Sequence, residues 1–564
     1  MKKKEILHER RDFENVRALI EWAGDEYAER TLFSYRETIR GEKISSTFAS
    51  FRGDVRALAT ELRAKGVCGK KCVIVGKLSY EWALVYYSVL CAGGVLVPLD
   101  RDWGANELAK TAKKADASFL FYDAELREKA DTIAAETELC EAPIVLKDKE
   151  NNKGLYELLA EGRVKFEADS SVYFESEIPA DETSLIVFTS GTTGEGKGVM
   201  LSQTCFLSDL SSIIPYIDFT NKSIAVLPPH HTYGSSVMLI GHVMIGSEVY
   251  ISAGLRYIQK ELEMEKPGHL VLVPLYLETF YRKILAKAKE GGKDKLLFRM
   301  IKISNFLLKF GIDLRKKFFK SVRAAFGGEV SMVISGGAPI NSEIIYFFES
   351  VGISTLNGYG ITECAPIIAV NRSRRNIHGS VGPVIDIDTV KIDSPNEAGE
   401  GEIWVKGPNV MLGYYKNEEA TRDAFSEDGF FKTGDYGRLD GDVITITGRK
   451  KNLIILSNGK NVYPEEIESE LIATPGVIDI IVYEGQSRRG MEHNAIVAEV
   501  YPDKEYIEKN GITDIKAHLQ KYVDAYNRNA VPYKKIGVLK VRDEEFPKNT
   551  LRKILRFKLD MSID

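Results

Sequence analysis

Short runs of apolar residues alternate with helical patterns along roughly the first 400 residues of the chain. The runs occupy residues 72–75, 95–97, 119–122, 185–188, 224–227, 271–273 and 333–334. Strands that are apolar at every position are typical of sheets that helices cover on both faces. The pattern therefore predicts an α/β fold for most of the chain.

The pattern changes after about residue 400, where short strands separated by glycine turns replace the helical segments. Residues 402–405 and 443–447 are such strands, and a smaller mixed segment with strands at 478–483 and 495–500 follows. We therefore expect a domain boundary near residues 448–452, with one domain over residues 1–450 and a second over residues 451–564.

The longest stretch without a formal charge covers residues 82–99, which is at the lower edge of the length that spans a membrane. Gly93, Gly94 and Pro98 interrupt it. We interpret it instead as a buried helix followed by a short strand at residues 95–97.

Composition narrows the choice of function. With 564 residues, 44% of them hydrophobic, the chain can bury several cores. The net charge of −5 gives no basic excess, so we expect no nucleic-acid partner. Six scattered cysteines without histidines at metal-ligand spacing indicate reduced thiols, and the charged N-terminus lacks the apolar stretch of an export signal. A cytoplasmic location is expected.

The strongest local signal is a loop of small hydroxyl residues and glycines directly after the apolar run at 185–188. Such a loop offers backbone N–H groups, hydroxyls and a cation to a polyphosphate. The residues expected to bind phosphate are Thr189, Ser190, Gly191, Thr192, Thr193, Gly194 and Lys197. A Walker loop fits less well, because Gly198 stands where that motif needs a hydroxyl for Mg²⁺. A glycine-rich surface loop remains the alternative.

This loop resembles the phosphate-loop signature of the acyl- and aryl-adenylate-forming (AMP-binding) superfamily, which includes acyl-CoA synthetases, luciferases and peptide-synthetase adenylation domains. It departs from the signature at Gly196, where proline is usual, and glycine is expected to loosen the backbone there. Further motifs of the superfamily follow in order at residues 227–234, 335–339, 357–363, 433–435, 448–451, 458–467 and 547–556.

The resemblance implies a role for individual residues of these motifs. Tyr359 would offer an aromatic face to the purine, and Asp435 would accept hydrogen bonds from the two ribose hydroxyls. Thr362 would contact a phosphate and Glu363, with Thr189, would bind Mg²⁺. The other residues implied to contact the nucleotide are Gly336, Gly337, Ala338, Asn357, Gly358, Gly360 and Arg449.

Three further roles depend on register within a motif. His231 would lie beside the acyl pocket, although a histidine there is also compatible with a purely structural role. Lys553 would be catalytic, although Arg552 stands where glycine is common and a terminal basic run is often only solvated. Lys451 falls at the hinge between the two domains. For the motif at 357–363, a glycine turn with an incidental surface glutamate is the alternative.

The resemblance also implies a fold and a reaction. Residues 1–450 would contain two α/β sheets and a distorted β-barrel, and residues 451–564 a small mobile α+β lid. ATP and Mg²⁺ would convert a carboxylic acid to acyl-AMP, and coenzyme A would accept the acyl group. Two alternatives stay open: delivery to the thiol of an acyl carrier protein, and a non-catalytic acyl-nucleotide-binding protein that retains the fold.

The segment between residues 286 and 330 bears on the substrate and on a membrane partner. Its charged and aromatic character resembles the long-chain fatty acid–CoA ligase branch, which indicates a fatty acid substrate. Residues 293–323 carry ten basic side chains against two acidic ones, interleaved with leucines and phenylalanines. This suits an interfacial helix on the inner membrane surface. A helix packed on its own domain is the alternative.

Overall fold

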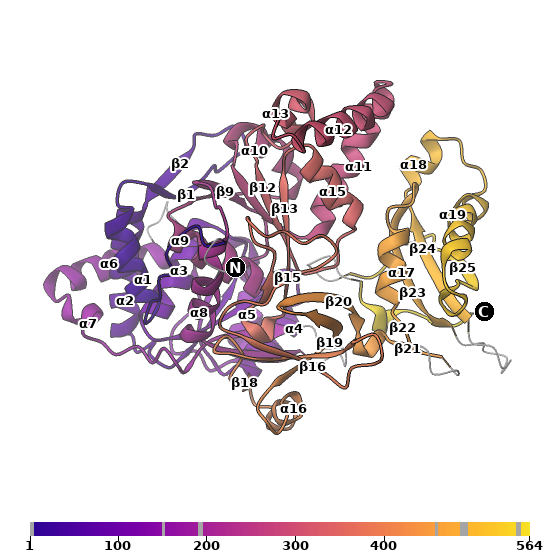
Figure 1. Ribbon diagram of the computed structural model, residues 1–564. Coiled ribbons are helices and arrows are strands. Elements are labelled where there is room, and N and C mark those ends of the chain that lie inside the picture. The colour runs from indigo at the N-terminus through magenta and orange to yellow at the C-terminus, as the bar shows by residue number, and fades with distance from the viewer. Residues whose placement is uncertain are drawn as a thin grey trace.

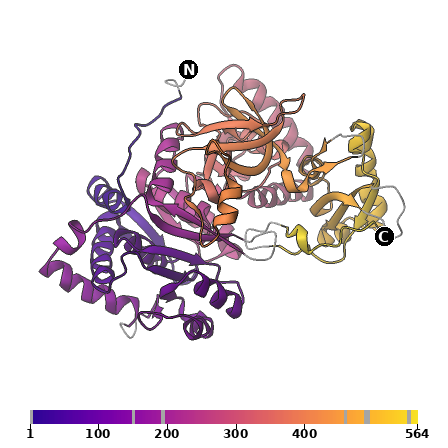
Figure 2. The ribbon, with the colours of Figure 1, turned by 90° about the horizontal axis from the view of Figure 1, so that it is seen from below.

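The computed structural model describes residues 5–148, 153–189, 196–456, 461–485, 495–548 and 554–563 (Figure 1). The chain forms a large N-terminal region and a small C-terminal region. Figure 2 shows from a second direction that the C-terminal region lies beside the large one. The α/β prediction and the division into a large and a small region are confirmed.

A seven-stranded sheet with the order β18-β8-β7-β4-β3-β5-β6 forms the first layer of the large region. Its edge strands are β18 (Gly413–Tyr414) and β6 (Ile144–Val145). Its centre is parallel, and β4 (Val95–Leu99) is buried at every position between helices. The other long strands are β3 (Lys71–Val75), β5 (Ala117–Tyr122), β7 (Thr183–Thr189) and β8 (Lys197–Ser202).

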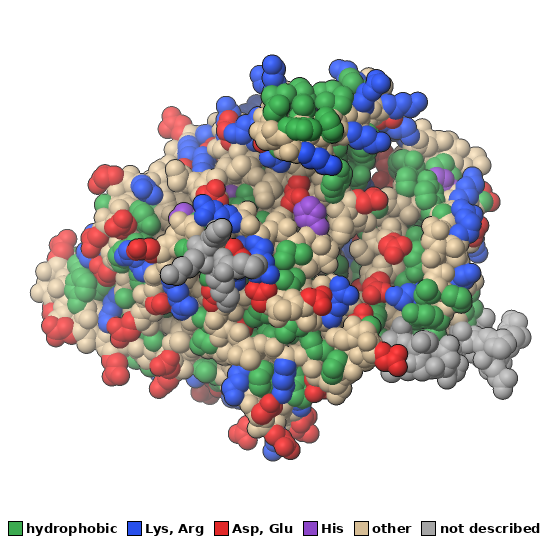
Figure 3. All heavy atoms as spheres, in the orientation of Figure 1, with side chains coloured by type: hydrophobic (Ala, Val, Ile, Leu, Met, Phe, Trp, Pro, Cys, Tyr) green, Lys and Arg blue, Asp and Glu red, His purple; other side chains and the backbone are tan. Residues whose placement is uncertain are grey.

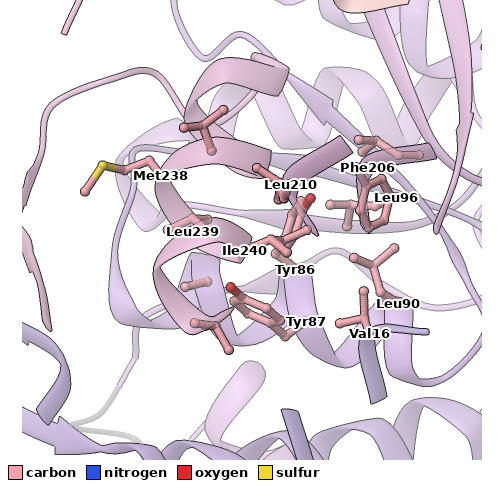
Figure 4. Close-up of a cluster of buried hydrophobic side chains, with 14 of the residues drawn as sticks. Val16, Tyr86, Tyr87, Leu90, Leu96, Phe206, Leu210, Met238, Leu239 and Ile240 are labelled. Atoms are coloured by element: carbon pink, nitrogen blue, oxygen red, sulfur yellow. The ribbon is translucent and has the colours of Figure 1, made fainter. Parts of the chain in front are cut away.

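The uncharged stretch at residues 82–99 is the buried helix α3 (Tyr80–Cys91) followed by β4, as the sequence predicts. Figure 4 shows the packing around it: Tyr86, Tyr87 and Leu90 of α3 face Phe206 and Leu210 of α8 (Gln203–Ile213) and residues 238–240 of the π-helix η4 (Tyr233–Ile240). Within the described residues, no helix combines the length and the apolar character needed to cross a membrane.

Two four-stranded sheets complete the α/β part of the large region. One has the order β2-β1-β10-β9, with β1 (Thr31–Tyr35), β2 (Ile44–Thr47) and β10 (Glu248–Ile251). The other has the order β11-β12-β13-β14 and ends at β14 (Ile367–Val370). In the second, β11 (His269–Leu272), β12 (Met332–Ser335) and β13 (Ser354–Gly360) run parallel. Strands β9 (Lys222–Ala225) and β11 approach each other without forming a hydrogen-bonded ladder. The α/β sheets are therefore three rather than the expected two.

The expected distorted barrel is an open antiparallel sheet with the order β15-β20-β19-β17-β16. No ladder between the described residues joins its edge strands, β15 (Gly382–Pro383) and β16 (Thr389–Asp393). Pro383 has no N–H to donate, so β15 cannot extend the ladder as a full strand would. The inner strands are β17 (Gly401–Lys406), β19 (Phe431–Asp440) and β20 (Val443–Arg449).

The C-terminal region has its own sheet and its own apolar core. Strands β23 (Val477–Gly485), β24 (Ala495–Pro502) and β25 (Val538–Val541) form the sheet. Helices α17 (Pro464–Leu471) and α19 (Ile515–Asn529) contribute Ile467, Leu471, Leu519 and Val523 to the core with the sheet. Its buried apolar residues cluster separately from those of the large region.

Two glycines on packed helices provide a test of the large region's packing. Helix α6 (Leu155–Ala168) lies against α2 (Phe48–Ala64), and a Cβ atom on Gly162 would lie 2.1 Å from the carbonyl oxygen of Ala57. Alanine gains about 1 kcal/mol of helix propensity over glycine, but this overlap with backbone costs about 1–3 kcal/mol or more. We expect Gly162→Ala to lower the thermal unfolding midpoint of the large region.

Gly53→Ala on α2 is the matched control, because a Cβ atom on Gly53 would have no neighbour within 4 Å. It should raise the midpoint through about 0.5–1 kcal/mol of propensity and unfolded-state entropy. Equal midpoint changes in the two variants would contradict the close approach of α6 and α2.

Candidate functional site

The predicted nucleotide loops gather at the carboxyl ends of two neighbouring parallel strands. Gly336 directly follows β12, and the last residue of β12, Ser335, is the register partner of Asn357 on β13. A Cβ atom on Gly336 would lie 3.5 Å from the carbonyl oxygen of Gly358, and one on Gly360 would lie 2.0 Å from that of Pro366. Gly337 adopts a positive φ of 85°. Glycine is therefore needed at Gly360, where a Cβ atom would overlap the backbone of the same loop, and at Gly337, because of its positive φ, whereas a Cβ atom on Gly336 would make only an ordinary contact.

Asp435 connects this strand-end loop to the antiparallel sheet. Its Oδ2 accepts a 2.8 Å hydrogen bond from the Tyr359 hydroxyl, and its Oδ1 lies 3.2 Å from Nε of Arg449. Asp435 on β19 and Arg449 on β20 are cross-strand partners, so the ladder fixes this pair. Burial, and then the Asp435 carboxylate, raise the pKa of Tyr359. The Asp435 carboxylate likewise raises the pKa of Arg449.

A second set of contacts surrounds Glu363, which lies in the 3₁₀ turn η6 (Thr362–Cys364) with Thr362. Oε1 of Glu363 accepts a 2.9 Å hydrogen bond from the Tyr414 hydroxyl. The ring of the same tyrosine contacts a lysine: Nζ of Lys197 lies 4.7 Å from the centre of the Tyr414 ring. Burial raises the pKa of Glu363. Burial, and then the charge of the Glu363 carboxylate, raise the pKa of Tyr414. Tyr414 thus joins the predicted phosphate lysine to the predicted metal ligand.

Thr189 and Lys197 are opposite each other where β7 and β8 part, at the two ends of the predicted phosphate loop. The Thr189 hydroxyl lies 3.4 Å from the carbonyl oxygen of Lys197. The predicted loop residues between them, and the predicted catalytic lysine, lie outside the described residues: Ser190, Gly191, Thr192, Thr193, Gly194 and Lys553. In the part of the chain that is described, no group of three or more His, Cys, Asp or Glu side chains could hold a metal ion.

His231 is half-buried and lies beside the buried His230, with their ring centres 4.3 Å apart. Nε2 of His230 lies 3.6 Å from Oδ2 of Asp100, and burial lowers the pKa of His230. Two residues further on, the Tyr233 hydroxyl lies 3.2 Å from the carbonyl oxygens of Leu272 and Ile334, at the ends of β11 and β12. These contacts bring the histidine segment against the Gly336 loop.

A cavity of about 550 Å³ lies between the two regions of the chain. The large region contributes Gly337, Ala338 and Arg449 to its wall, Lys451 lies at the junction, and the C-terminal region contributes Glu465, Glu468, Asp479 and Arg556 among others. Burial, and then the repulsion of Arg449, lower the pKa of Lys451. Burial raises the pKa of Glu468 to about 7, although Arg556 pairs with it. The cavity therefore presents cations and carboxyl groups to a polar ligand.

Sequence reasoning missed the residues that support the Glu363 turn from behind. The Asn409 amide lies 3.2 Å from the Cys364 carbonyl oxygen, 2.9 Å from that of Ile367, and 3.2 Å from Oδ2 of Asp388. Asp209 accepts a 3.3 Å hydrogen bond from the Ile367 N–H. Burial raises the pKa of Asp388 to about 8 and also raises that of Asp209.

The signal that could have found part of this support is the run at residues 407–415, where two glycines and two tyrosines follow a strand. Such a run predicts a tight turn that presents aromatic hydroxyls. The partners Asp209 and Asp388 carry no comparable signal, because neither belongs to a turn motif: Asp209 is a single acid in an apolar segment, and Asp388 follows Asp386 in an alternating apolar and acidic run.

The comparisons with known proteins agree with this geometry. The AMP-binding enzyme family matches residues 20–415. The chain is 27% identical over 473 residues to the long-chain-fatty-acid–CoA ligase FadD15 of Mycobacterium tuberculosis, covering 79% of this chain and 76% of the relative. It is 30% identical over 413 residues to the chloroplastic long-chain-fatty-acid–[acyl-carrier-protein] ligase AEE15 of Arabidopsis thaliana, covering 62% and 55%.

Among solved structures, the crystal structure of ATP-bound MatB from Rhodopseudomonas palustris is similar with a TM-score of 0.74 at 25% identity, covering 96% of this chain and 97% of that one. The resemblance to the adenylate-forming superfamily, and within it to the long-chain fatty acid–CoA ligases, is confirmed.

The buried acid behind the Glu363 turn gives a pH-dependent prediction. Asp388 keeps its proton in the folded chain at a pH where the unfolded chain, with a carboxyl pKa near 3.9, has released it. Its contribution to stability is therefore present at low pH and declines as the pH rises from about 4 toward 8. Asp388→Asn removes this cost, so the gain in unfolding free energy should be larger at pH 7.5 than at pH 5, by on the order of 2 kcal/mol.

Asp428→Asn is the control of opposite sign, because Lys391 and Ser426 lower the pKa of this exposed carboxyl to about 2. It should bring no gain at either pH. An Asp388→Asn protein that loses stability equally at pH 5 and pH 7.5 would show that the buried carboxyl is ionised in the folded chain.

Proposed function

The chain belongs to the AMP-binding enzyme family of acyl-adenylate-forming ligases, and from that premise we propose that it is a long-chain fatty acid–CoA ligase. It would convert a fatty acid and ATP to acyl-AMP and pyrophosphate, and then transfer the acyl group to coenzyme A with release of AMP. The observation that carries this proposal is the convergence of two contact sets, Tyr359–Asp435–Arg449 and Lys197–Tyr414–Glu363, at one edge of the sheets.

The first half reaction follows from the poor reactivity of a carboxylate, whose charge is delocalised and whose oxygen is a poor leaving group. Attack of a carboxylate oxygen on the α-phosphorus forms the acyl–phosphate bond and breaks the bond to pyrophosphate, so that AMP becomes the leaving group. The difficulty is that one anion must approach another. Lys197 and Lys553 would offset this repulsion, and one unit charge at about 4 Å is worth roughly 4 kcal/mol at an intermediate effective dielectric.

The nucleotide roles are assigned as the motifs imply. Each oxygen of Asp435 already has a protein partner, but a carboxylate oxygen can accept more than one hydrogen bond, so the ribose hydroxyls can be added. Tyr359 would stack on adenine, and Thr362 would contact a phosphate. The remaining loop contacts would come from Thr189, Ser190, Gly191, Thr192, Thr193, Gly194, Gly336, Gly337, Ala338, Asn357, Gly358 and Gly360.

Glu363 and Thr189 would hold Mg²⁺. Both residues offer the hard oxygen ligands that this ion prefers, beside the proposed phosphate-binding loop. When bound, the ion neutralises phosphate charge. One protein carboxylate, that of Glu363, would be sufficient, because proteins commonly hold Mg²⁺ through one or two carboxylates together with the substrate phosphates. His231 would border the acyl pocket, because its segment is anchored beside the Gly336 loop through Tyr233.

In the second half reaction, the coenzyme A thiolate attacks the acyl carbon and AMP leaves. We propose that residues 1–450 and 451–564 are the two domains and that the smaller one rotates about Lys451 between the half reactions. The separate apolar cores of the two regions support this division, and so does the position of Lys451 on the wall of the cavity between them. Rotation would withdraw Lys553 and admit the thiol.

The long-chain acid is supported by the relative named a long-chain-fatty-acid–CoA ligase. Delivery to a carrier protein is the second candidate, favoured by the relative named an acyl-carrier-protein ligase. A non-catalytic role is disfavoured because Lys197, Glu363 and Asp435 lie together with intact contacts. We further propose a cytoplasmic location with a membrane surface as partner of residues 293–323, and no nucleic-acid partner.

Pyrophosphate release across acids of graded chain length tests the substrate. Release should depend on the acid, should rise for long chains, and should be followed by thioester formation with free coenzyme A. Asp435→Ala should weaken ATP binding at least tenfold, because the tyrosine and arginine partners and the ribose hydroxyls lose their acceptor. Thioester formation only with acyl carrier protein would select the second candidate, and no pyrophosphate release with any acid would select the non-catalytic one.

The two half reactions should respond to different lysines. Lys553→Ala should lower acyl-AMP formation by roughly 10²–10³-fold, because the α-phosphate loses a countercharge, yet should still convert supplied acyl-AMP and coenzyme A to thioester. Lys451→Pro should impair thioester formation instead, because proline fixes φ near −65° at the pivot. Single-turnover measurement of each half reaction separates the two effects.

Lys451→Ala is the matched control at the hinge, because it removes the same side chain and leaves the backbone free to rotate. If it slows thioester formation as much as Lys451→Pro does, the side chain acts rather than the pivot. Equal impairment of both half reactions in all three variants would contradict the rotation.

A further inference from the structure

Large apolar side chains gather on the solvent side of one segment of the large region. Fourteen such side chains are exposed among the described residues, and six of them fall between residues 296 and 312: Leu296, Phe298, Ile303, Phe306, Phe310 and Ile312. Most lie on helix α12 (Asp294–Leu308). Figure 3 shows these hydrophobic side chains over α12 and α13 (Arg315–Phe318), with Lys and Arg side chains around them.

Packing against the rest of the domain uses the other side of the same helix. Ile301 and Ser304 are its buried residues. The Asn305 amide lies 2.9 Å from the Tyr346 hydroxyl and 2.9 Å from that of Ser350, which holds α12 on α15 (Ser342–Ser350). The exposed apolar residues are therefore not needed to attach the helix, and the alternative of a helix packed on its own domain accounts for one face only.

The two most exposed side chains of this segment are phenylalanines at the end of the helix. Phe306 is 59% exposed and Phe310 is 67% exposed, and their ring centres lie 5.1 Å apart at an angle of 64°. They form a small apolar projection at the point where α12 ends. Exposed aromatic rings in contact with each other are unusual on a surface that faces only water.

The charge around this projection is more uniform than the sequence suggests. Two of the ten basic residues turn inward: Arg315 pairs with Asp313, at 2.7 Å, and donates to the Glu349 carbonyl oxygen, while Arg323 is buried and donates to that of Gly352. The other eight are exposed, and no ion pair with a described residue engages them: Lys293, Lys295, Arg299, Lys302, Lys309, Lys316, Lys317 and Lys320. Asp294 is then the one acidic side chain of the segment without such a partner.

We propose that this face, formed by α12, residues 309–312 and the lysines of residues 316–320, docks on an anionic lipid bilayer. The lysines would contact the headgroups, and Phe306 and Phe310 would enter the interface below them. Charge complementarity selects this partner, because eight free cations surround an apolar centre that an anionic bilayer can accept and that a nucleic acid cannot. The attachment is peripheral, since α12 has 15 residues and carries several charges.

The docking surface deepens the proposed function without depending on it. A long-chain acid partitions into a bilayer, so an enzyme that docks there meets its substrate at high local concentration. Vesicle binding needs neither ATP nor turnover, however, so the surface can be tested even if the substrate assignment fails.

Cosedimentation of the full chain with large unilamellar vesicles tests the proposal. The chain should bind vesicles that contain phosphatidylglycerol, bind those of phosphatidylcholine alone at least tenfold more weakly, and lose binding as salt is raised. Two variants should each weaken binding to the anionic vesicles about tenfold or more: Phe306→Ser with Phe310→Ser, and Lys316→Glu with Lys317→Glu and Lys320→Glu.

Matched controls change the same kinds of side chain elsewhere. Val164→Ser with Phe174→Ser removes two exposed apolar residues, and Lys70→Glu with Lys516→Glu and Lys521→Glu reverses three exposed lysines. Both should bind as the unmodified chain does, and all four variants should keep their activity on detergent-dispersed acid. Equal vesicle binding by surface and control variants, or absence of binding by the unmodified chain, overturns the proposal. A chain that ignores vesicles but dimerises through Phe306 and Phe310 in light scattering would assign the face to a second copy.

Discussion

The arrangement of the site depends on the contact of the Asp435 carboxylate with Tyr359 and Arg449. A buried carboxylate is costly unless it is paired and hydrogen-bonded, and here one partner comes from the strand-end loop of a parallel sheet and the other from the antiparallel sheet. The same contact therefore fixes the position of β13 relative to β19 and β20. Because Arg449 immediately precedes the junction with the C-terminal region, this contact also sets where the smaller region begins.

Buried acids around the site are stabilised in two different ways. Asp435 has a cation beside it. Among the described residues, the Asn409 amide contacts the carboxyls of both Asp209 and Asp388, and the Ile367 N–H contacts that of Asp209, so burial raises the pKa of both acids. The first arrangement keeps an acceptor ready for a ligand. The second makes an uncharged support behind the turn that carries Glu363, where an additional negative charge would repel the phosphates that the turn is proposed to face.

The exposed face of α12 is built from residues that take no part in the nucleotide site. Helix α12 uses Ile301, Ser304 and Asn305 to attach to the domain, and its remaining apolar side chains face solvent among cations. A single amphipathic helix normally has one apolar side, which packs. Here two apolar sides exist, and the exposed one carries the cationic surroundings on which the proposed docking to a lipid surface rests.

The sequence by itself determined the α/β character, the buried helix at α3 and the order of the loops, because apolar periodicity and glycine-rich turns are local properties. Only the tertiary structure decided that Tyr414 joins Lys197 to Glu363 and that Asn409 supports the turn, since these partners are about 45 to 220 residues apart in the chain. It also decided that the antiparallel sheet with edge strands β15 and β16 stays open among the described residues, and that Arg315 and Arg323 turn inward. Local pattern specifies which elements form, but the partner of a polar side chain depends on how distant elements pack.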